Sequence, residues 1–347
     1  MVNQSERLLN AFSELYFYKE LTFSDLKYRP QGQTERELAD ILIKVKNYVL
    51  AIQLKARNTC DRTEDETNEE KWLEKKCRIA KSQIEETIKI IESGTPLMFN
   101  NNRGDTITID NGLTVVPLVM FMNPTIKKYN RILLKHSEIG MDINCISYED
   151  FCYVCKMLIT PMEIIDYFIW RKEKYLNNYK TETLICIDED GFSLSSMDGK
   201  EPLLGIFLHE KYGINSIIKN KTNLNTFRFI LLNLKERLVA QSQDNASIEL
   251  VDFFSALTRI EINALVERLN SAIEYSKDNK EKKIIGTLRT EEYCIFVMAS
   301  KDNSEMLDYY LNIVLEKVNT PVLVGISVYW ENKKEFRIDF IYKNILL

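Results

Sequence analysis

The longest regular pattern in the sequence lies between residues 69 and 92, and it constrains the fold more than any other feature. Apolar side chains recur there at steps of three and four residues: Leu73, Cys77, Ala80, Ile84, Ile88 and Ile91. This spacing places them on one face of an α-helix, and Gly94 and Pro96 then end the pattern. A helix with one apolar face must bury it against a partner, and the flanking apolar runs are short enough to be strands. We therefore expect a layered α/β fold.

The N-terminal half alternates between the two kinds of element. Helical patterns are expected over residues 4–18, 69–92, 148–158 and 161–178, and strand patterns over 21–26, 38–43, 48–55, 106–110, 114–122 and 144–147. The polar stretch 44–47 joins two apolar runs and predicts a β-hairpin, although no Asn-Gly pair supports it. We expect residues 1–180 to form one α/β domain with a mixed central sheet flanked by helices.

The C-terminal half is expected to be a separate α+β domain, residues 181–347. It begins after the polar segment KYLNNYKTET and shows no motif with recognisable chemistry. Short strands and turns are expected over 184–208, helices over 223–240, 248–275 and 305–317, and strands over 283–289, 293–300, 322–330 and 335–342. Recognition, dimerisation or regulation is the role expected for this half.

Composition excludes several classes of protein. The densest apolar run, residues 113–122, is too short to span a membrane, and the N-terminus MVNQSERLLN is too polar for a signal peptide, so a cytoplasmic protein is expected. The net charge of −5 argues against a protein that coats DNA without specificity. The chain has two histidines and seven scattered cysteines. Cys152 and Cys155 form a CxxC, but within an apolar run that favours core thiols over a zinc site.

Three polar side chains stand out in the apolar strands between residues 37 and 58. Asp40 stands in one apolar strand. Gln53 and Lys55 stand thirteen and fifteen residues later in the next, where they share one face because side chains alternate along a strand. If the two strands pair as a hairpin, Asp40 lies beside the other two. Polar groups in such strands cost roughly 2–7 kcal/mol each unless they find partners, and a divalent cation is one such partner.

This grouping suggests metal-assisted phosphate chemistry. Mg²⁺ or Mn²⁺ prefers oxygen ligands, which the Asp40 carboxylate, the Gln53 amide and the Leu54 backbone carbonyl would supply. Lys55 would then stabilise charge on a phosphate. An acid on the first helix could complete the ligand set, with Glu6 as the candidate and Glu14 as the weaker option. Glu37 lies an odd number of residues before Asp40, and strand alternation would place it on the opposite face.

Each residue also has an interpretation without catalysis. Asp40 could be a strand-end acid that accepts a hydrogen bond from a backbone amide. Lys55 could be a lysine on an edge strand that faces water. The order of helix, strands, motif and helix favours the joint interpretation.

An acid on a first helix, an Asp at a strand end and a (D/E/Q)xK tripeptide on the next strand resemble the PD-(D/E)xK nuclease superfamily. Here these residues are Glu6, Asp40 and Gln53-Leu54-Lys55, in an arrangement similar to that of Mrr, nuclease-related and Holliday-junction-resolvase-like domains. The resemblance implies a restriction-endonuclease-like fold over about residues 1–95. Over residues 96–180 the resemblance is limited to an alternating pattern of strands and helices. Gln53 stands at the motif position that is usually an acid, and this replacement removes one negative charge from the metal ligands.

The resemblance further implies a function. It suggests a Mg²⁺-dependent endonuclease that hydrolyses DNA, with RNA left open, in defence against foreign DNA. Partners would be a second copy of the chain or a protein of a defence complex. Side chains expected to contact phosphates are Lys27, Arg29, Arg36 and Arg57. The alternative is a catalytically inactive nuclease fold that binds nucleic acid or assembles a complex.

Overall fold

The computed structural model divides the chain into two compact units, Met1–Lys219 and Asn220–Leu347. The division lies after helix α5 (Leu204–Ile218) rather than near residue 180, where the sequence placed it. The structure describes residues 4–28, 35–126, 129–133, 141–176, 186–188, 191–193, 201, 203–218, 227–228, 230–232, 234, 246–278, 283–300, 306–331 and 335–345. Among these residues, no helix combines the length and apolar character needed to cross a membrane.

A mixed six-stranded sheet forms the centre of the first unit, with strand order β1-β4-β5-β8-β10-β9. The strands β4 and β5 form the predicted antiparallel hairpin, whereas β5, β8 and β10 are mutually parallel. Their bounds are β1 (Thr22–Phe23), β4 (Ile41–Val45), β5 (Tyr48–Ala56), β8 (Thr114–Met122), β9 (Ile132–Leu133) and β10 (Ile143–Ser147). The hairpin turn is tighter than expected and consists of Lys46, at a φ of 50°, and Asn47.

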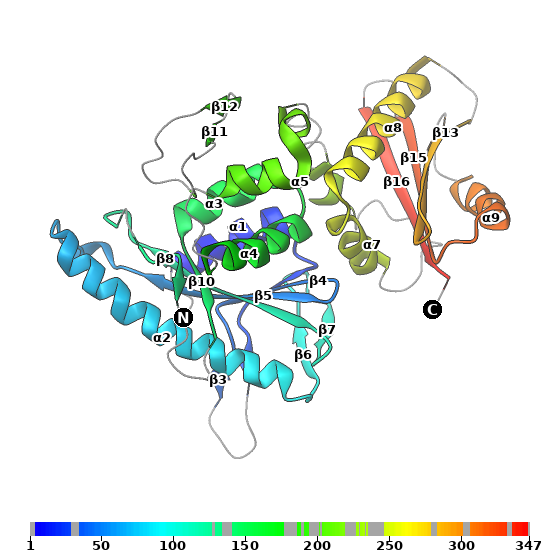
Figure 1. Ribbon diagram of the computed structural model, residues 1–347. Helices are drawn as coiled ribbons and strands as arrows, with labels where there is room; N and C mark the ends of the chain where they lie inside the picture. Colours follow the sequence, from blue (N-terminus) through cyan, green and yellow to red (C-terminus); the bar gives the residue numbers. More distant parts are fainter. Residues whose placement is uncertain are drawn as a thin grey trace. The chain divides into compact units, whose positions relative to one another are not determined.

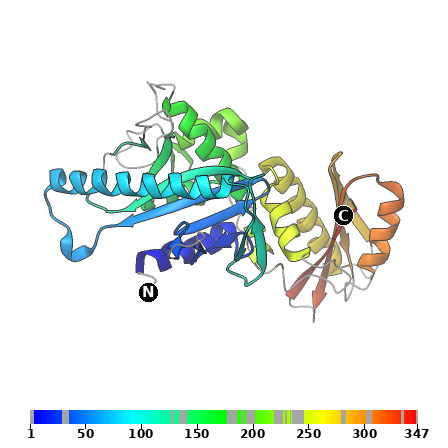
Figure 2. The same cartoon turned by 90° about the horizontal axis from the view of Figure 1, so that it is seen from below.

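Helices cover both faces of this sheet (Figure 1). The predicted long helix is α2 (Glu66–Glu92), which begins at the N-cap Asp65 and packs on β5 and β8. Figure 2 shows it extending along the sheet. Its apolar stripe meets the side chains of Val119 and Phe121. The opposite face carries α1 (Gln4–Phe17), α3 (Tyr148–Met157) and α4 (Pro161–Leu176).

Smaller elements surround the sheet. Two short hairpins are separate from it: β2 (Lys27–Tyr28) with β3 (Arg36–Glu37), and β6 (Leu97–Asn100) with β7 (Thr106–Ile109). A 3-10 turn (Thr59–Asp61) precedes α2, and a third hairpin joins β11 (Cys186–Asp188) to β12 (Gly191–Ser193). Strands and turns were expected up to residue 208, but helix α5 (Leu204–Ile218) occupies the end of this stretch. Phe207 packs there against Tyr167 of α4, which buries the apolar run.

The second unit contains a four-stranded mixed sheet of order β13-β14-β15-β16. The helix expected over 248–275 is two helices in the structure, because the chain leaves helical geometry at residues 256–258. The helix expected over 223–240 lies largely outside the described residues. The elements are α7 (Ala246–Ser255), α8 (Arg259–Asp278), β13 (Lys283–Arg289), β14 (Tyr293–Ala299), α9 (Leu307–Lys317), β15 (Val322–Glu331) and β16 (Glu335–Asn344).

Candidate active site

The hairpin register brings Asp40, Gln53 and Lys55 to one end of β4 and β5. Ile41 at the start of β4 lies opposite Ile52 of β5, so Asp40, directly before Ile41, and Gln53, directly after Ile52, lie at the same end of the hairpin. The backbone N–H of Leu54 donates to Asp40 Oδ2 at 2.5 Å. Lys55 Nζ donates to Gln53 Oε1 at 3.3 Å. The three side chains that the sequence grouped therefore lie side by side.

Burial disfavours the charged forms of Asp40 and Lys55. Gln53 is 3% exposed, and Lys55 and Asp40 are partly buried. Loss of solvent raises the pKa of Asp40, although the Leu54 N–H and the Lys55 ammonium act in the opposite direction. Loss of solvent also lowers the pKa of Lys55, and nearby Lys76 adds to this, whereas Asp40 opposes it. Burial thus disfavours the charged form of both residues.

The structure bears on the two interpretations without catalysis. The strand β5 lies between β4 and β8, but its pairing with β4 ends at Ile52, so Lys55 pairs with β8 on one side only and is partly buried. For Asp40, the bond from Leu54 N–H is the contact that a purely structural acid would also make. The distinctive feature is therefore the partly buried lysine, which β5 holds beside a buried amide and a carboxylate.

A cavity of about 200 Å³ extends from Asp40 toward α1. Its lining includes Glu6, which therefore lies near Asp40 as predicted, and it also includes Glu37. The other lining residues are Arg7, Asn10, Ser24 and Asp25. Glu14 is absent from this lining and instead accepts a hydrogen bond from Asn102 Nδ2 at 3.0 Å.

The expectation that Glu37 faces away from Asp40 is wrong. Residues 38–40 are not part of a strand, so side-chain alternation does not apply between Glu37 and Asp40. Partial burial raises the pKa of Glu37, and the negative charges of Asp40 and Glu6 raise it further. Glu37 is therefore a carboxyl group of this site that strand periodicity missed.

The donor set fits a hard cation that keeps several waters. Among the described residues, no three His, Cys, Asp or Glu side chains are close enough to hold a metal ion together. The predicted ligand set contains only two such acids, Asp40 and Glu6, and takes its other oxygens from the Gln53 amide and the Leu54 carbonyl. Mg²⁺ is commonly bound by one or two carboxylates with water and substrate oxygens in the remaining positions.

The cations expected to contact phosphate are differently placed. Lys27 Nζ lies 3.5 Å from Glu35, and Arg36 Nη1 lies 2.6 Å from Glu86 of α2. Both pairs are well exposed, which leaves these cations accessible to a ligand. Arg29 lies outside the described residues.

Arg57 has a structural partner that the sequence did not indicate. Its guanidinium donates from Nε and Nη2 to the two carboxylate oxygens of Glu69, at 3.1 and 3.2 Å. Asn123 Nδ2 and Thr63 N–H donate to the same carboxylate at 2.6 and 3.0 Å. Burial alone would raise the pKa of Glu69, but these hydrogen bonds lower it to about 2. The pair joins the end of β5 to the first turn of α2.

A second group of charges is enclosed between β10 and α4. Arg171 and Glu201 are both 0% exposed, and Arg171 Nε and Nη2 donate to the Glu201 carboxylate at 3.1 and 3.2 Å. Arg171 also donates to Asn144 Oδ1 and to the backbone carbonyls of Arg131 and Cys145, at 2.9 to 3.0 Å. Burial opposes ionisation of Glu201, but Arg171 and Arg131 lower its pKa overall.

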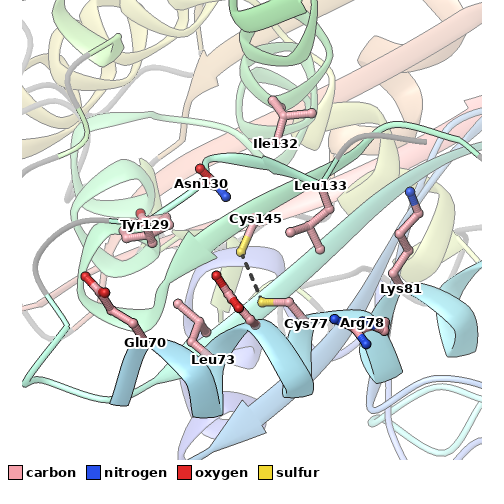
Figure 3. Close-up of a pocket in the computed structure, with 11 residues that line it drawn as sticks. Glu70, Leu73, Cys77, Arg78, Lys81, Tyr129, Asn130, Ile132, Leu133 and Cys145 are labelled. Carbon is pink, nitrogen blue, oxygen red and sulfur yellow. Dashed lines mark hydrogen bonds between the residues drawn. The ribbon is translucent and has the colours of Figure 1, made fainter. Parts of the chain in front are cut away.

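A larger cavity, of about 690 Å³, lies between α2 and the β9–β10 edge of the sheet (Figure 3). Its apolar part contains the sulfur atoms of Cys77 and Cys145, 3.8 Å apart. Residues lining it are Glu70, Leu73, Glu74, Cys77, Arg78, Lys81, Tyr129, Asn130, Ile132, Leu133 and Cys145. The sequence placed Cys77 on the apolar face of the long helix and gave no sign that it meets Cys145.

Comparisons with family models, with curated proteins and with solved structures found no match to this chain.

Proposed function

We propose that the first unit is a metal-dependent endonuclease that hydrolyses phosphodiester bonds in DNA. The observation that carries this proposal is the grouping of Asp40, Gln53 and Lys55 at the end of one hairpin, beside a cavity that Glu6 also lines. These are the positions on which the sequence resembles the PD-(D/E)xK superfamily.

The chain order around the site supports the same proposal. The helix α1 is followed by the antiparallel strands β1, β4 and β5, then by α2 and the parallel strand β8. A restriction-endonuclease-like domain would place its first acid on α1, its Asp before β4 and its lysine on β5. The second unit would then serve recognition, dimerisation or regulation, and a role in defence against foreign DNA is what the resemblance suggests.

The residues of the site would divide the work of hydrolysis. Asp40, Gln53, Glu6 and the Leu54 carbonyl would hold Mg²⁺ or Mn²⁺, which supplies charge neutralisation and an activated water. Lys55 would donate to a phosphate oxygen, since its Nζ already lies at hydrogen-bond distance from a neutral amide oxygen. Partial burial of the site strengthens such an interaction because little water competes for it. Lys27 and Arg36 would position the nucleic-acid backbone.

A cleavage assay tests this proposal. Supercoiled plasmid, short DNA duplexes and RNA would be incubated with the full chain and Mg²⁺ or Mn²⁺, beside Asp40→Ala and Lys55→Ala. Loss of a group that stabilises the transition state reduces turnover by ~10²–10³, so we expect at least such a loss in both variants. Lys44→Ala changes another lysine of the same hairpin and is the matched control. Full activity in both site variants would contradict the assignment.

One pair of observations favours an inactive nuclease fold that binds nucleic acid or assembles a complex. Gln53 replaces an acid, and the described residues provide no three-carboxylate metal site. Metal-dependent stability separates the two functions, because a cation that binds the folded chain raises its melting temperature. An active site predicts such a rise for the wild type and none for Asp40→Ala. DNA binding without a metal effect or cleavage would support the inactive fold.

A further inference from the structure

Cys77 and Cys145 lie far apart in the sequence but meet in the first unit. Cys77 belongs to α2 and Cys145 to β10, 68 residues later, and their sulfur atoms are 3.8 Å apart. Figure 3 shows the two side chains pointing toward each other at the large cavity. A disulfide bond is about 2.05 Å long, so a modest movement of either side chain would bring the sulfurs to bonding distance.

The cavity gives a reagent access to these thiols. Cys77 is 5% exposed and Cys145 is 1% exposed, yet both line the space of about 690 Å³. Binding sites for drug-sized molecules have volumes of about 300–1,000 Å³. The lining carries two cations, Arg78 and Lys81, and two acids, Glu70 and Glu74, so it offers charged partners for both the carboxylates and the ammonium groups of a peptide disulfide.

We propose that Cys77 and Cys145 form a redox site, which a low-molecular-weight disulfide converts into an intrachain disulfide that fastens α2 to β10. This site goes beyond the nuclease proposal and does not depend on it. Neither cysteine belongs to the group around Asp40.

The reaction consists of two thiol–disulfide exchanges. The Cys77 thiolate attacks one sulfur of glutathione disulfide, a new S–S bond forms, and one glutathione thiolate leaves. The Cys145 thiolate then attacks the Cys77 sulfur and expels the second glutathione thiolate. The two cysteine protons are transferred to the two glutathione thiolates, so the protein loses two electrons and glutathione disulfide gains them.

The order of attack follows from the surroundings of the two sulfurs. Cys77 is the more exposed of the two. The contact with Cys77 and complete burial both raise the pKa of the Cys145 thiol, so Cys145 is the poorer first nucleophile.

Peptide mapping of the wild-type chain tests the site. The full protein would be incubated with excess glutathione disulfide, its remaining thiols alkylated, and its peptides identified by mass spectrometry. We expect a cross-linked pair of peptides containing Cys77 and Cys145, with a mass lower by two hydrogen atoms. Cys60 is exposed and should carry glutathione as a mixed disulfide. The oxidised chain should melt at a higher temperature and return to the original value on reduction, because closing a long loop restricts the unfolded chain.

Two cysteine variants test the order of the exchange steps and the specificity of the cross-link. Cys145→Ser removes the resolving thiol, so glutathione should remain on Cys77. Cys60→Ser is the control and should leave the cross-link unchanged. Complete modification of Cys60 while Cys77 and Cys145 stay reduced would overturn the proposal, as would a cross-link between other cysteines. The wild-type map decides the question even if Cys145→Ser does not fold.

Discussion

The first unit holds two groups of charged side chains whose environments differ in kind. Around Arg171 and Glu201, each charge is met by a partner, and Glu201 has a lowered pKa despite complete burial. Around Asp40, burial raises the pKa of two carboxyl groups and lowers that of Lys55, so all three charges are disfavoured. The same unit therefore contains a buried ion pair, Arg171 and Glu201, whose charges are balanced, and a group around Asp40 in which burial outweighs the compensating contacts.

The difference indicates what each group is for. A buried and fully hydrogen-bonded ion pair holds its elements in one arrangement and leaves little capacity for a ligand. A group whose charges are poorly compensated gains stabilisation when a cation or a phosphate binds. Perturbed pKa values in a cavity are typical of functional sites. The comparison predicts opposite effects of mutation in the two groups.

The largest expected effect is on the free energy of unfolding of Arg171→Met. The substitution leaves Glu201 buried with Arg131 as its remaining cation, and loss of one partner from a buried pair costs ~3–5 kcal/mol. We expect a loss near the lower value, about 3 kcal/mol, measured by urea unfolding. Arg36→Met is the control, because it removes an exposed pair that is worth ~0–1 kcal/mol. Equal stability of the two variants would remove the distinction between the groups.

Lys55→Met should have a smaller effect of the opposite sign. Folding lowers the pKa of Lys55, so the protonated side chain is less favourable in the folded chain than in the unfolded chain. At neutral pH the charge of Lys55 therefore reduces the free energy of unfolding. The variant should therefore unfold at a higher temperature than the wild type at pH 7. This gain should fade as the pH rises through the ordinary range of lysine. A gain that persists unchanged at high pH would have another cause.

Asp40→Asn should also stabilise the chain at neutral pH. The folded pKa of Asp40 is raised, so the wild type loses stability as the pH rises through that pKa. Asn retains an oxygen that can accept the bond from Leu54 N–H. The melting temperatures of the two proteins should converge below the ordinary pKa of Asp and diverge above it. If the nuclease proposal holds, both site variants gain stability and lose cleavage.

The smallest effect is local and concerns Glu37. The negative charge of Asp40 helps to raise the pKa of Glu37, so Asp40→Asn should lower it. Carboxyl-carbon NMR over a pH series measures this change directly. An unchanged titration of Glu37 would mean that the two carboxyl groups do not interact.

The sequence predicted the parts of this site that depend on regular periodicity. The stripe of α2 and the alternation along β5 required only local spacing, and the predicted hairpin then brought Asp40 to the end of β5 that carries Gln53 and Lys55. Glu37 was missed because its path to Asp40 is irregular. The role of Glu69 was missed because it stands among five other acids in DRTEDETNEE, residues 61–70, a composition typical of a solvated segment. Its burial depends on Asn123, 54 residues away.

One error had a signal in the sequence. The helix expected over 248–275 breaks before Thr258, whose hydroxyl accepts from the Glu261 N–H at 3.4 Å, while Glu261 Oε2 accepts from Thr258 N–H at 2.7 Å. This arrangement is a capping box, and the sequence pattern Thr-x-x-Glu predicts one at the start of a helix. The break was missed because apolar residues continue at helical spacing across it.

The Arg57–Glu69 pair also bears on the order in which the chain assembles. Its two residues are only twelve positions apart, so the loop that they close costs less conformational entropy than a longer one. The contacts of β5 with β8 instead join residues more than sixty positions apart, such as Tyr48 and Thr114. Local contacts tend to form early because little chain must be ordered first. We therefore expect the hairpin and α2 to associate into a folding nucleus before β8 joins the sheet.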